Sequence, residues 1–411
     1  MTNIWFEIKE GMFIALRAIR ANKVRSILTM LGIVIGITSV VLMTTAIRGI
    51  DNAFQQGISS LGSDVLYISK WPWFEHEDFW KIRNRRNITM EDFEKFKELA
   101  KMPIAVAPMV TSMRTVKNGS ISMDNVILTG SNADYIKTTN FTFDVGRFFS
   151  ETESKSSRNV AVLGSEVAST LFPRGDALDK EIKIGNEIFK VVGVLAKQGS
   201  FLLGSFNPDN DVYLPIGTVF KYFNSRWASS ITINVRADGT AMVSKTKDEA
   251  EGVMRKVRGL LYNEQDDFAI NQQEALQQNF NSVVGVIQIA GLFITGLALF
   301  VGAIGIMNIM FVSVRERTKE IGLRKAIGAK RRTILSQFIM ESSAICLMGG
   351  LVGLLLAVIL SIIVNKFLPT SVSYSAVLIA IFVSLITGIL AGFAPAYTAA
   401  KMDPVEALRF E

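Results

Sequence analysis

Residues 283–314 read VVGVIQIAGLFITGLALFVGAIGIMNIMFVSV and contain no charged side chain. A helix needs about 20 mainly apolar residues to cross a bilayer, so this stretch predicts a transmembrane helix. Three further stretches lack charge over a similar length: 26–47, 342–365 and part of 367–400. The chain is therefore predicted to be an α-helical membrane protein with four transmembrane helices.

The composition narrows the kinds of site that the chain can hold. Charged residues make up 20% of its 411 residues, against about 25% in soluble domains. The single Cys346 excludes an intramolecular disulfide framework and a zinc or iron–sulfur site built from cysteines. The single His76 excludes a multi-histidine metal site, and its acidic neighbours favour a solvated charge cluster over catalysis. We expect no metal site and no catalytic residue.

The distribution of the +7 formal charge predicts the orientation in the membrane. Residues 1–25 carry five basic and two acidic groups, and residues 315–341 carry eight basic and three acidic groups. Residues 48–281 are nearly neutral, with 28 basic and 29 acidic groups. Basic loops stay on the cytoplasmic side of a membrane. The chain is therefore predicted to cross the cell (inner) membrane with both termini in the cytoplasm and residues 48–281 on the opposite side. With this orientation, the basic tract 330–332 indicates an anchor at the membrane surface rather than a nucleic-acid binding site.

The N-terminal residues 4–20 have the pattern of an amphipathic helix in the cytoplasmic membrane interface. The alternative is a frayed polar N-terminus. The first apolar stretch is followed by Arg48 and Gly49 rather than a cleavage pattern, so we expect a retained anchor. After this stretch, apolar residues continue at i+4 spacing as far as Ile58, and a run of glutamines precedes the second span. These two features predict that both helices extend beyond the membrane and form a stalk. The alternative is two tilted helices with ordinary loops.

Between these helices, the sequence predicts a large mixed α/β domain. Strand patterns occur at 65–69, 126–128, 159–163, 187–194, 211–214 and 231–235. Thr89, with Asp92 three residues later, predicts a capped helix start, and 245–261 reads as a helix. The apolar clusters 71–74 and 201–203 lie in predicted loops. Two interpretations are open for them: contact with a membrane, a partner or cargo, or ordinary core or loop packing.

Glycines predict close helix packing in the membrane. Gly388 and Gly392 lie on one helix face, where small residues let neighbouring helices approach. No Asp, Glu, Lys or Arg is expected inside a span, which argues against an ion-driven transporter. Four spans are few for a transport path, so a second permease copy is expected. The predicted segments are 1–25 (interfacial helix), 26–60 (transmembrane helix and stalk), 61–270 (outer domain), 271–314 (stalk and transmembrane helix), 315–335 (cytoplasmic coupling segment), 336–365 (transmembrane helix), 366–374 (outer loop), 375–397 (transmembrane helix) and 398–411 (C-terminal helix).

The loop after the second span predicts a docking segment for a cytoplasmic partner. Its apolar residues Ile321, Leu323 and Ile327 alternate with charges beside glycines, which suits a short helix entering another protein's groove. The alternative is a solvated linker. The predicted docking residues are Glu320, Ile321, Gly322, Leu323, Arg324, Lys325, Ala326, Ile327, Gly328 and Ala329.

A second helix signal lies near the C-terminus. Asp403 suits an N-cap, Pro404 suits the first helical position, and Glu406 completes a capping-box arrangement. This terminal helix could also touch the partner.

The sequence resembles the MacB-like permeases of the type VII ABC transporter superfamily, which includes FtsX and LolC/LolE proteins. The resemblance covers nearly the whole chain. Its most specific part is RTKEIGLRKAIGA at 317–329, together with DPVEALR at 403–409. Residues 16–33, 163–168 and 191–195 resemble the family's N-terminal segment and extracytoplasmic core.

The resemblance implies a homodimer or pseudo-dimer whose cytoplasmic helix contacts an ATPase and whose stalk transmits movement. Full-length MacB carries a nucleotide-binding domain before its first span, where this chain has only about 25 residues. No Gly-x-x-x-x-Gly-Lys-Ser/Thr loop occurs either, so ATP and Mg²⁺ are expected on a separate ABC ATPase subunit. We therefore expect a permease that is not itself an enzyme and holds no cofactor.

Three functions follow from this resemblance. The first is export of a peptide, drug or lipid-linked cargo, with a periplasmic adaptor and an outer-membrane channel where two membranes exist. The second is lipoprotein release, as in LolC/LolE. The third is FtsX-like regulation of an extracytoplasmic hydrolase, which the size of 48–281 makes less favoured. The sequence does not identify the cargo.

Overall fold

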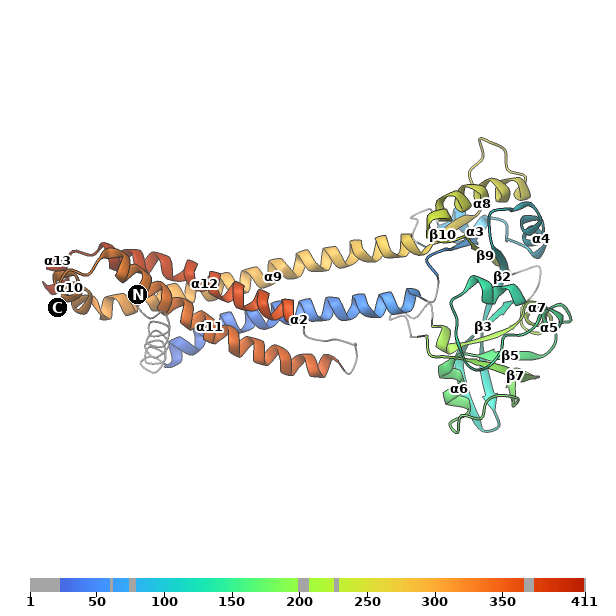
Figure 1. Ribbon diagram of the computed structural model, residues 1–411, viewed down its shortest axis with the longest axis horizontal. Helices are drawn as coiled ribbons and strands as arrows, with labels where there is room; N and C mark the ends of the chain where they lie inside the picture. Colours follow the sequence, from blue (N-terminus) through green and yellow to red (C-terminus); the bar gives the residue numbers. More distant parts are fainter. Residues whose placement is uncertain are drawn as a thin grey trace. The chain divides into compact units, whose positions relative to one another are not determined.

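The computed structural model describes residues 23–59, 62–73, 79–198, 207–224, 229–365 and 373–409 (Figure 1). The chain divides into two compact units, one of residues 1–51 with 283–411 and the other of residues 52–282. Several predicted features lie outside the described residues. They are the interfacial helix at 4–20, the cluster around His76, the apolar residues 201–203 and most of the outer loop 366–374.

Four helices are long and apolar enough to cross a membrane. The sequence makes them helical because each combines a long uncharged run with small residues at the contacts between helices. Two shorter helices, α10 (Thr318–Ala326) and α13 (Pro404–Arg409), follow the second and fourth long helices. The four long helices are α2 (Lys23–Ser59), α9 (Gln273–Glu316), α11 (Arg331–Val364) and α12 (Tyr374–Lys401).

The helix ends differ from the predicted boundaries at two places. The predicted coupling segment 315–335 includes the end of α9, which continues to Glu316, and the start of α11, which begins at Arg331. Helix α12 likewise continues beyond the predicted end of the fourth span at 397, through Pro395 to Lys401. Helices in membranes tolerate proline where neighbouring groups satisfy the freed backbone, so Pro395 does not stop α12. Residues 398–401 therefore belong to α12 rather than to the C-terminal helix.

The second unit contains a mixed α/β domain built on a ten-stranded sheet with the order β10-β1-β9-β2-β3-β8-β5-β7-β4 and β6 beside β2 and β7. Most strand pairs are antiparallel, but β3–β8 and β5–β7 are parallel. The strands are β1 (Val65–Ser69), β2 (Ala105–Asn118), β3 (Ile121–Ser131), β4 (Phe143–Gly146), β5 (Val160–Leu163), β6 (Glu181–Ile184), β7 (Glu187–Leu195), β8 (Asp211–Pro215), β9 (Thr232–Arg236) and β10 (Ala269–Gln272).

Strand β2 was not predicted, because it contains Pro108 and a polar, exposed second half. Proline lacks a backbone donor and is usually confined to places where a strand has one neighbour. The pairing explains why it is tolerated. The register with β3 begins at Met109, so Pro108 faces only β9, opposite Ile233.

Helices cover one face of this sheet. Their apolar side chains, such as Phe93, Phe96 and Met254, join Leu128 and Val212 of the strands in the main core. Thr89 begins α4 with a full capping box, in which its side chain and that of Asp92 each accept a backbone N–H. The helices are α3 (Phe79–Asn84), α4 (Met90–Leu99), α5 (Glu151–Lys155), α6 (Ser165–Leu171), α7 (Ile216–Tyr222) and α8 (Val243–Arg258), and the 3₁₀ turns are η1 (Ala133–Thr138), η2 (Pro208–Asn210) and η3 (Thr240–Met242).

Candidate functional site

The helix α10 packs against the C-terminal helix α13 (Figure 1). Ile321 is only 3% exposed, and Gly322 is buried beside it. A Cβ atom added at Gly322 would lie 2.7 Å from the Cβ of Ala407, which is closer than carbon atoms pack. The small residue at 322 is therefore needed for contact within the chain, and Gly322 lies on the buried side of the predicted docking segment.

Two other apolar side chains, one in α10 and one at its C-terminal end, are exposed rather than packed against α13. Leu323 is 53% exposed and Ile327 is 79% exposed. The structure therefore splits the predicted docking face, with Ile321 inside and the other two residues outside. Neighbouring Arg324 and Ala326 are also exposed. This outer part of α10, centred on Leu323 and Ile327, is called the α10 outer surface below.

A Schellman motif ends α10 and fixes the position of Ile327. Gly328 has a positive φ of 101°, which favours glycine, and its N–H donates to the Lys325 carbonyl at 3.0 Å. The Ala329 N–H reaches further back, to the Arg324 carbonyl, also at 3.0 Å. Gly328 is thus required by backbone geometry, and a Cβ there would meet no atom within 4 Å.

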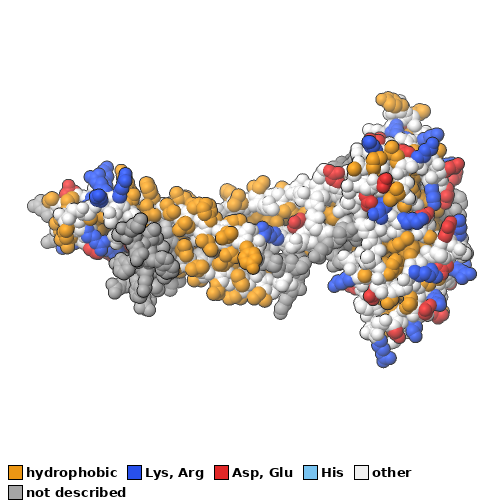
Figure 2. All heavy atoms as spheres, viewed as in Figure 1, with side chains coloured by type: hydrophobic (Ala, Val, Ile, Leu, Met, Phe, Trp, Pro, Cys, Tyr) orange, Lys and Arg blue, Asp and Glu red, His pale blue; other side chains and the backbone are white. Residues whose placement is uncertain are grey.

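Positive charge surrounds the α10 outer surface. Figure 2 shows Lys and Arg side chains gathered at the end of the helical unit. Within and just after α10, the exposed basic residues include Lys319, Arg331 and Arg332. Arg324 pairs with Glu320 one turn earlier and donates to Gln337 of α11 at 2.8 Å. The Lys325 ammonium donates to the Met402 carbonyl, and burial lowers its pKa, as does the nearby charge of Arg331.

A buried ion pair ties the start of α10 to α11. Glu341 is 2% exposed and accepts a hydrogen bond from Arg317 at 3.1 Å. Glu341 lies in α11 directly before the uncharged stretch 342–365. Charged groups in such segments usually pair with each other, as these two do. Sequence reasoning missed the pair because its members are 24 residues apart.

Gly388 and Gly392 lie where α12 packs against α11. A Cβ at Gly388 would fall 2.6 Å from the Ser343 Cα, and one at Gly392 would fall 1.9 Å from the Ser342 Oγ. The Ser342 hydroxyl donates to the Gly388 carbonyl at 2.9 Å across the same contact. These two glycines therefore permit close approach of two helices.

The start of α13 is capped by Asp403. Its Oδ1 accepts the Val405 N–H at 2.8 Å, two residues along the chain. Pro404 is the first residue of α13, and Glu406 is exposed in its first turn. Asp403 thus starts the helix that covers Gly322. Over the ranges that the structure describes, no group of three or more His, Cys, Asp or Glu is placed to hold a metal ion.

Comparisons with known proteins match both parts of the chain. Residues 26–253 match the MacB-like periplasmic core domain, and residues 292–404 match the FtsX-like permease C-terminal family. The macrolide export ATP-binding/permease protein MacB of Bdellovibrio bacteriovorus is 34% identical over 409 residues, covering 98% of this chain and 62% of the relative. MacB of Wolinella succinogenes is 33% identical over 354 residues, covering 86% and 53%.

A solved structure is also similar. The periplasmic region of MacB from Actinobacillus actinomycetemcomitans is 19% identical, with a TM-score of 0.43, and covers 55% of this chain and 95% of that region. The chain spans between half and two thirds of the length of the two curated relatives above.

Four apolar helices with an α/β domain inserted after the first define an ABC transporter permease. The chain belongs to the MacB-like permeases of the type VII ABC transporter superfamily, so the resemblance read from the sequence is confirmed. It is an inner-membrane protein whose inserted domain is the periplasmic one.

Proposed function

We propose that the chain is the permease subunit of a mechanotransmission ABC transporter, with ATP hydrolysis in a separate ABC ATPase subunit. The relatives described above are ATP-binding/permease proteins, and this chain aligns with their permease portion. ATP and Mg²⁺ then bind to the ATPase, and the permease has a mechanical role. A dimeric ATPase calls for a second permease copy.

The α10 outer surface is the observation that carries this proposal. Leu323 and Ile327 expose apolar area on the side of the membrane that the charge counts predict to be cytoplasmic. Large exposed apolar side chains bounded by charges are typical of protein interaction sites. Movement of an ATPase against this surface would reach α11 through the Arg317–Glu341 pair and the end of α12 through the hydrogen bond from Lys325 to the Met402 carbonyl.

The length of α9 supports transmission of that movement. Its 44 residues would extend about 66 Å as a helix, about twice the hydrocarbon thickness. In the outer unit, the end of α2 packs on the start of α9. Phe54 stacks on Phe280 with ring centroids 3.8 Å apart, and Gln55 donates to Gln277 at 2.8 Å. These contacts support a stalk of two paired helices.

The proposed direction of work is export. Changes in the periplasmic domain would drive a peptide, drug or lipid-linked molecule onward, through an adaptor and an outer-membrane channel where the envelope has them. The termini lie in the cytoplasm in this proposal, as the lysine and arginine counts predict.

A photocrosslinking experiment tests the docking surface. A photoreactive amino acid at position 327 of the full chain, expressed in its own membranes, should crosslink to an ATP-binding subunit upon illumination. Leu323→Asp should reduce that crosslinking at least about tenfold, since an aspartate must lose water to enter an apolar groove.

Leu261 supplies the matched controls, because it is a similarly exposed leucine of the periplasmic domain. A photoreactive residue at 261 should give no ATPase crosslink, and Leu261→Asp should leave the crosslink from position 327 intact. Equal crosslinking from 261 and 327, or a crosslink that survives Leu323→Asp, would show that the ATPase docks elsewhere.

A further inference from the structure

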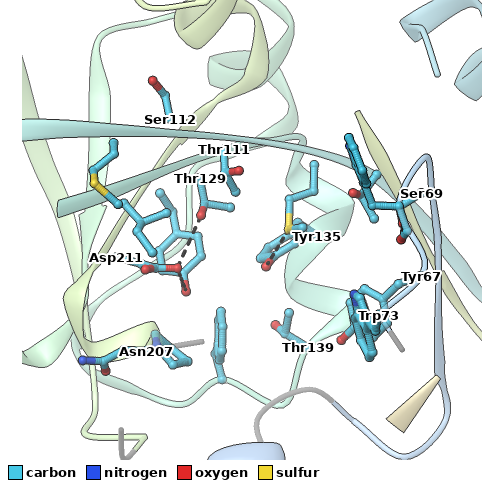
Figure 3. Close-up of a pocket in the computed structure, with 18 residues that line it drawn as sticks. Tyr67, Ser69, Trp73, Thr111, Ser112, Thr129, Tyr135, Thr139, Asn207 and Asp211 are labelled. Carbon is cyan, nitrogen blue, oxygen red and sulfur yellow. Dashed lines mark hydrogen bonds between the residues drawn. The ribbon is translucent and has the colours of Figure 1, made fainter. Parts of the chain in front are cut away.

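A pocket lies on the second face of the periplasmic sheet, opposite the face that the helices cover. Its volume is about 500 Å³, within the range of small-molecule sites. Side chains alternate along strands, so residues two apart point to the same face. Thr129 of β3 lies between Thr111 of β2 and Tyr213 of β8 in the sheet register, and all three line the pocket. Figure 3 shows several of the labelled residues converging on one space.

Aromatic rings form much of the pocket wall. The Tyr135 and Tyr213 rings lie 5.9 Å apart, and Phe141 meets Tyr213 edge-on at 5.4 Å. On another side, Tyr67 and Trp73 lie 5.2 Å apart. The faces of aromatic rings attract cations as well as apolar groups. The wall therefore suits a ligand that has an apolar body and a positive charge.

One carboxylate, that of Asp211, lines this pocket and is poorly compensated. Its Oδ2 accepts two long hydrogen bonds of 3.4 Å, from the hydroxyls of Thr129 and Tyr213. Its Oδ1 is buried, and no donor among the described residues reaches it. Burial raises the pKa of Asp211 to about 7, and the negative charge of Asp209 also raises it. The carboxylate is thus an acceptor in need of a donor.

The other groups near this carboxylate do not supply positive charge. Asn207 also lines the pocket, and its buried Oδ1 finds no donor among the described residues. The titratable neighbours of Asp211 are Asp209 and the phenols of Tyr213 and Tyr135. Burial raises the pKa of both tyrosines above the usual range. The described residues that line the pocket include no lysine or arginine. Among the described lining residues, the pocket therefore holds unpaired acceptors on Asp211 and Asn207 and no lysine or arginine to pair with them.

We propose that this pocket binds a small organic cation, an ammonium group attached to an apolar or aromatic body. The ammonium would lie on the Asp211 side and donate to its carboxylate, while the body would pack among the tyrosine and tryptophan rings. This site is separate from the α10 outer surface and does not depend on the proposed ATPase contact.

Three probes with one body and different charge test the proposal. Phenethylammonium, 2-phenylethanol and phenylacetate would each be titrated at pH 8 into the full chain in detergent, with tryptophan fluorescence as the readout, since Trp71 and Trp73 line the pocket. We expect the cation to bind at least about tenfold more tightly than the alcohol, and the anion to bind more weakly than either.

The variant Asp211→Asn should bring the affinity for the cation within about twofold of that for the alcohol. Asp238→Asn removes the same charge at an exposed position outside the pocket, and should keep the tenfold preference. Retained binding of the alcohol by Asp211→Asn, with an unfolding temperature at pH 5 no lower than that of the wild type, would show that the pocket is intact.

If Asp211→Asn does not fold, the wild-type protein decides the question through pH. Lowering the pH from 8 to 5.5 protonates Asp211 while the probe stays cationic, so the preference should fall at least about fivefold. Equal binding of cation and alcohol at pH 8, or a preference that survives either the substitution or the acid pH, would overturn the proposal.

Discussion

The helical unit and the periplasmic domain are packed by opposite kinds of residue. In the helical unit, backbones meet over glycines, as where a Cβ at Gly32 would lie 2.9 Å from the Gly302 Cα. In the periplasmic domain the core is filled by large side chains, among them Phe93, Phe96 and Phe189. Lipid is as apolar as leucine, so only close approach makes helices associate there, whereas water drives large side chains inward.

The two regions also treat buried polar groups differently. In the helical unit, side-chain hydroxyls donate hydrogen bonds to backbone carbonyls, as the Thr38 hydroxyl does to the Gly353 carbonyl at 2.9 Å. In the periplasmic domain, Arg258 is enclosed by Asp92, at 3.1 Å, and Asp267, at 2.6 Å. The carboxylate of Asp211 contrasts with this pairing, because its Oδ1 has no donor among the described residues. The comparison yields three predictions.

The largest expected effect is in the periplasmic core. Phe96→Ala should lower the free energy of unfolding of this domain by about 3–5 kcal/mol, since it removes a fully buried ring and leaves a cavity. Urea unfolding of the full chain, followed by protease resistance of the periplasmic domain, would measure the loss. A decrease below about 1 kcal/mol would contradict a core held by large side chains.

A smaller loss is expected where two helices meet in the membrane unit. Gly388→Ala should destabilise it by about 2–3 kcal/mol, because the new Cβ would lie 2.6 Å from the Ser343 Cα and backbone must shift. Unfolding of the purified protein in increasing SDS, followed by helix content, would show the shift.

The matched control for this prediction is Gly252→Ala. Gly252 lies within α8, where a Cβ would meet nothing within 4 Å. The same substitution should stabilise that helix by about 0.5–1 kcal/mol through helix propensity. The test is whether the two substitutions change the stability in opposite directions. Destabilisation at both sites would instead show that the protein tolerates alanine poorly at glycine positions in general.

The last prediction concerns the buried carboxylate of Asp211. Its folded pKa is raised to about 7 by burial, while an unfolded aspartate titrates near 4, so ionisation costs the folded state stability as pH rises between these values. Asp211→Asn should therefore be more stable than the wild type by about 4 kcal/mol at pH 8, since each unit of pKa difference is worth about 1.4 kcal/mol. Thermal unfolding of both proteins from pH 4 to 8 would check this. The difference should grow up to pH 7 and then level off, and a constant difference would contradict the titration.

The four long helices were predictable because each apolar run is contiguous in sequence. The strands β1, β5 and β7 were predictable for a similar reason, since each is a short run of residues such as 187–194. Strand β2 was not, because Pro108 is tolerated only through a register that depends on β3 and β9.

The candidate sites were less predictable, since they join distant parts of the chain. The motif at 317–329 was found, but nothing in it shows that Gly322 lies under Ala407. The Arg317–Glu341 pair was missed because each charge was counted alone. The periplasmic pocket takes its lining from five strands, so its residues share no local pattern.

The contact between Gly322 and Ala407 joins two motifs that are far apart in sequence. Their Cβ positions share one small space, so volume gained at one position must be given up at the other. Among related permeases, we expect the residues at these two positions to vary together, with alanine at 322 accompanied by glycine at 407. The loop motif and the terminal motif would then be inherited as one unit, and exchanging either alone between distant relatives would misfit at this point.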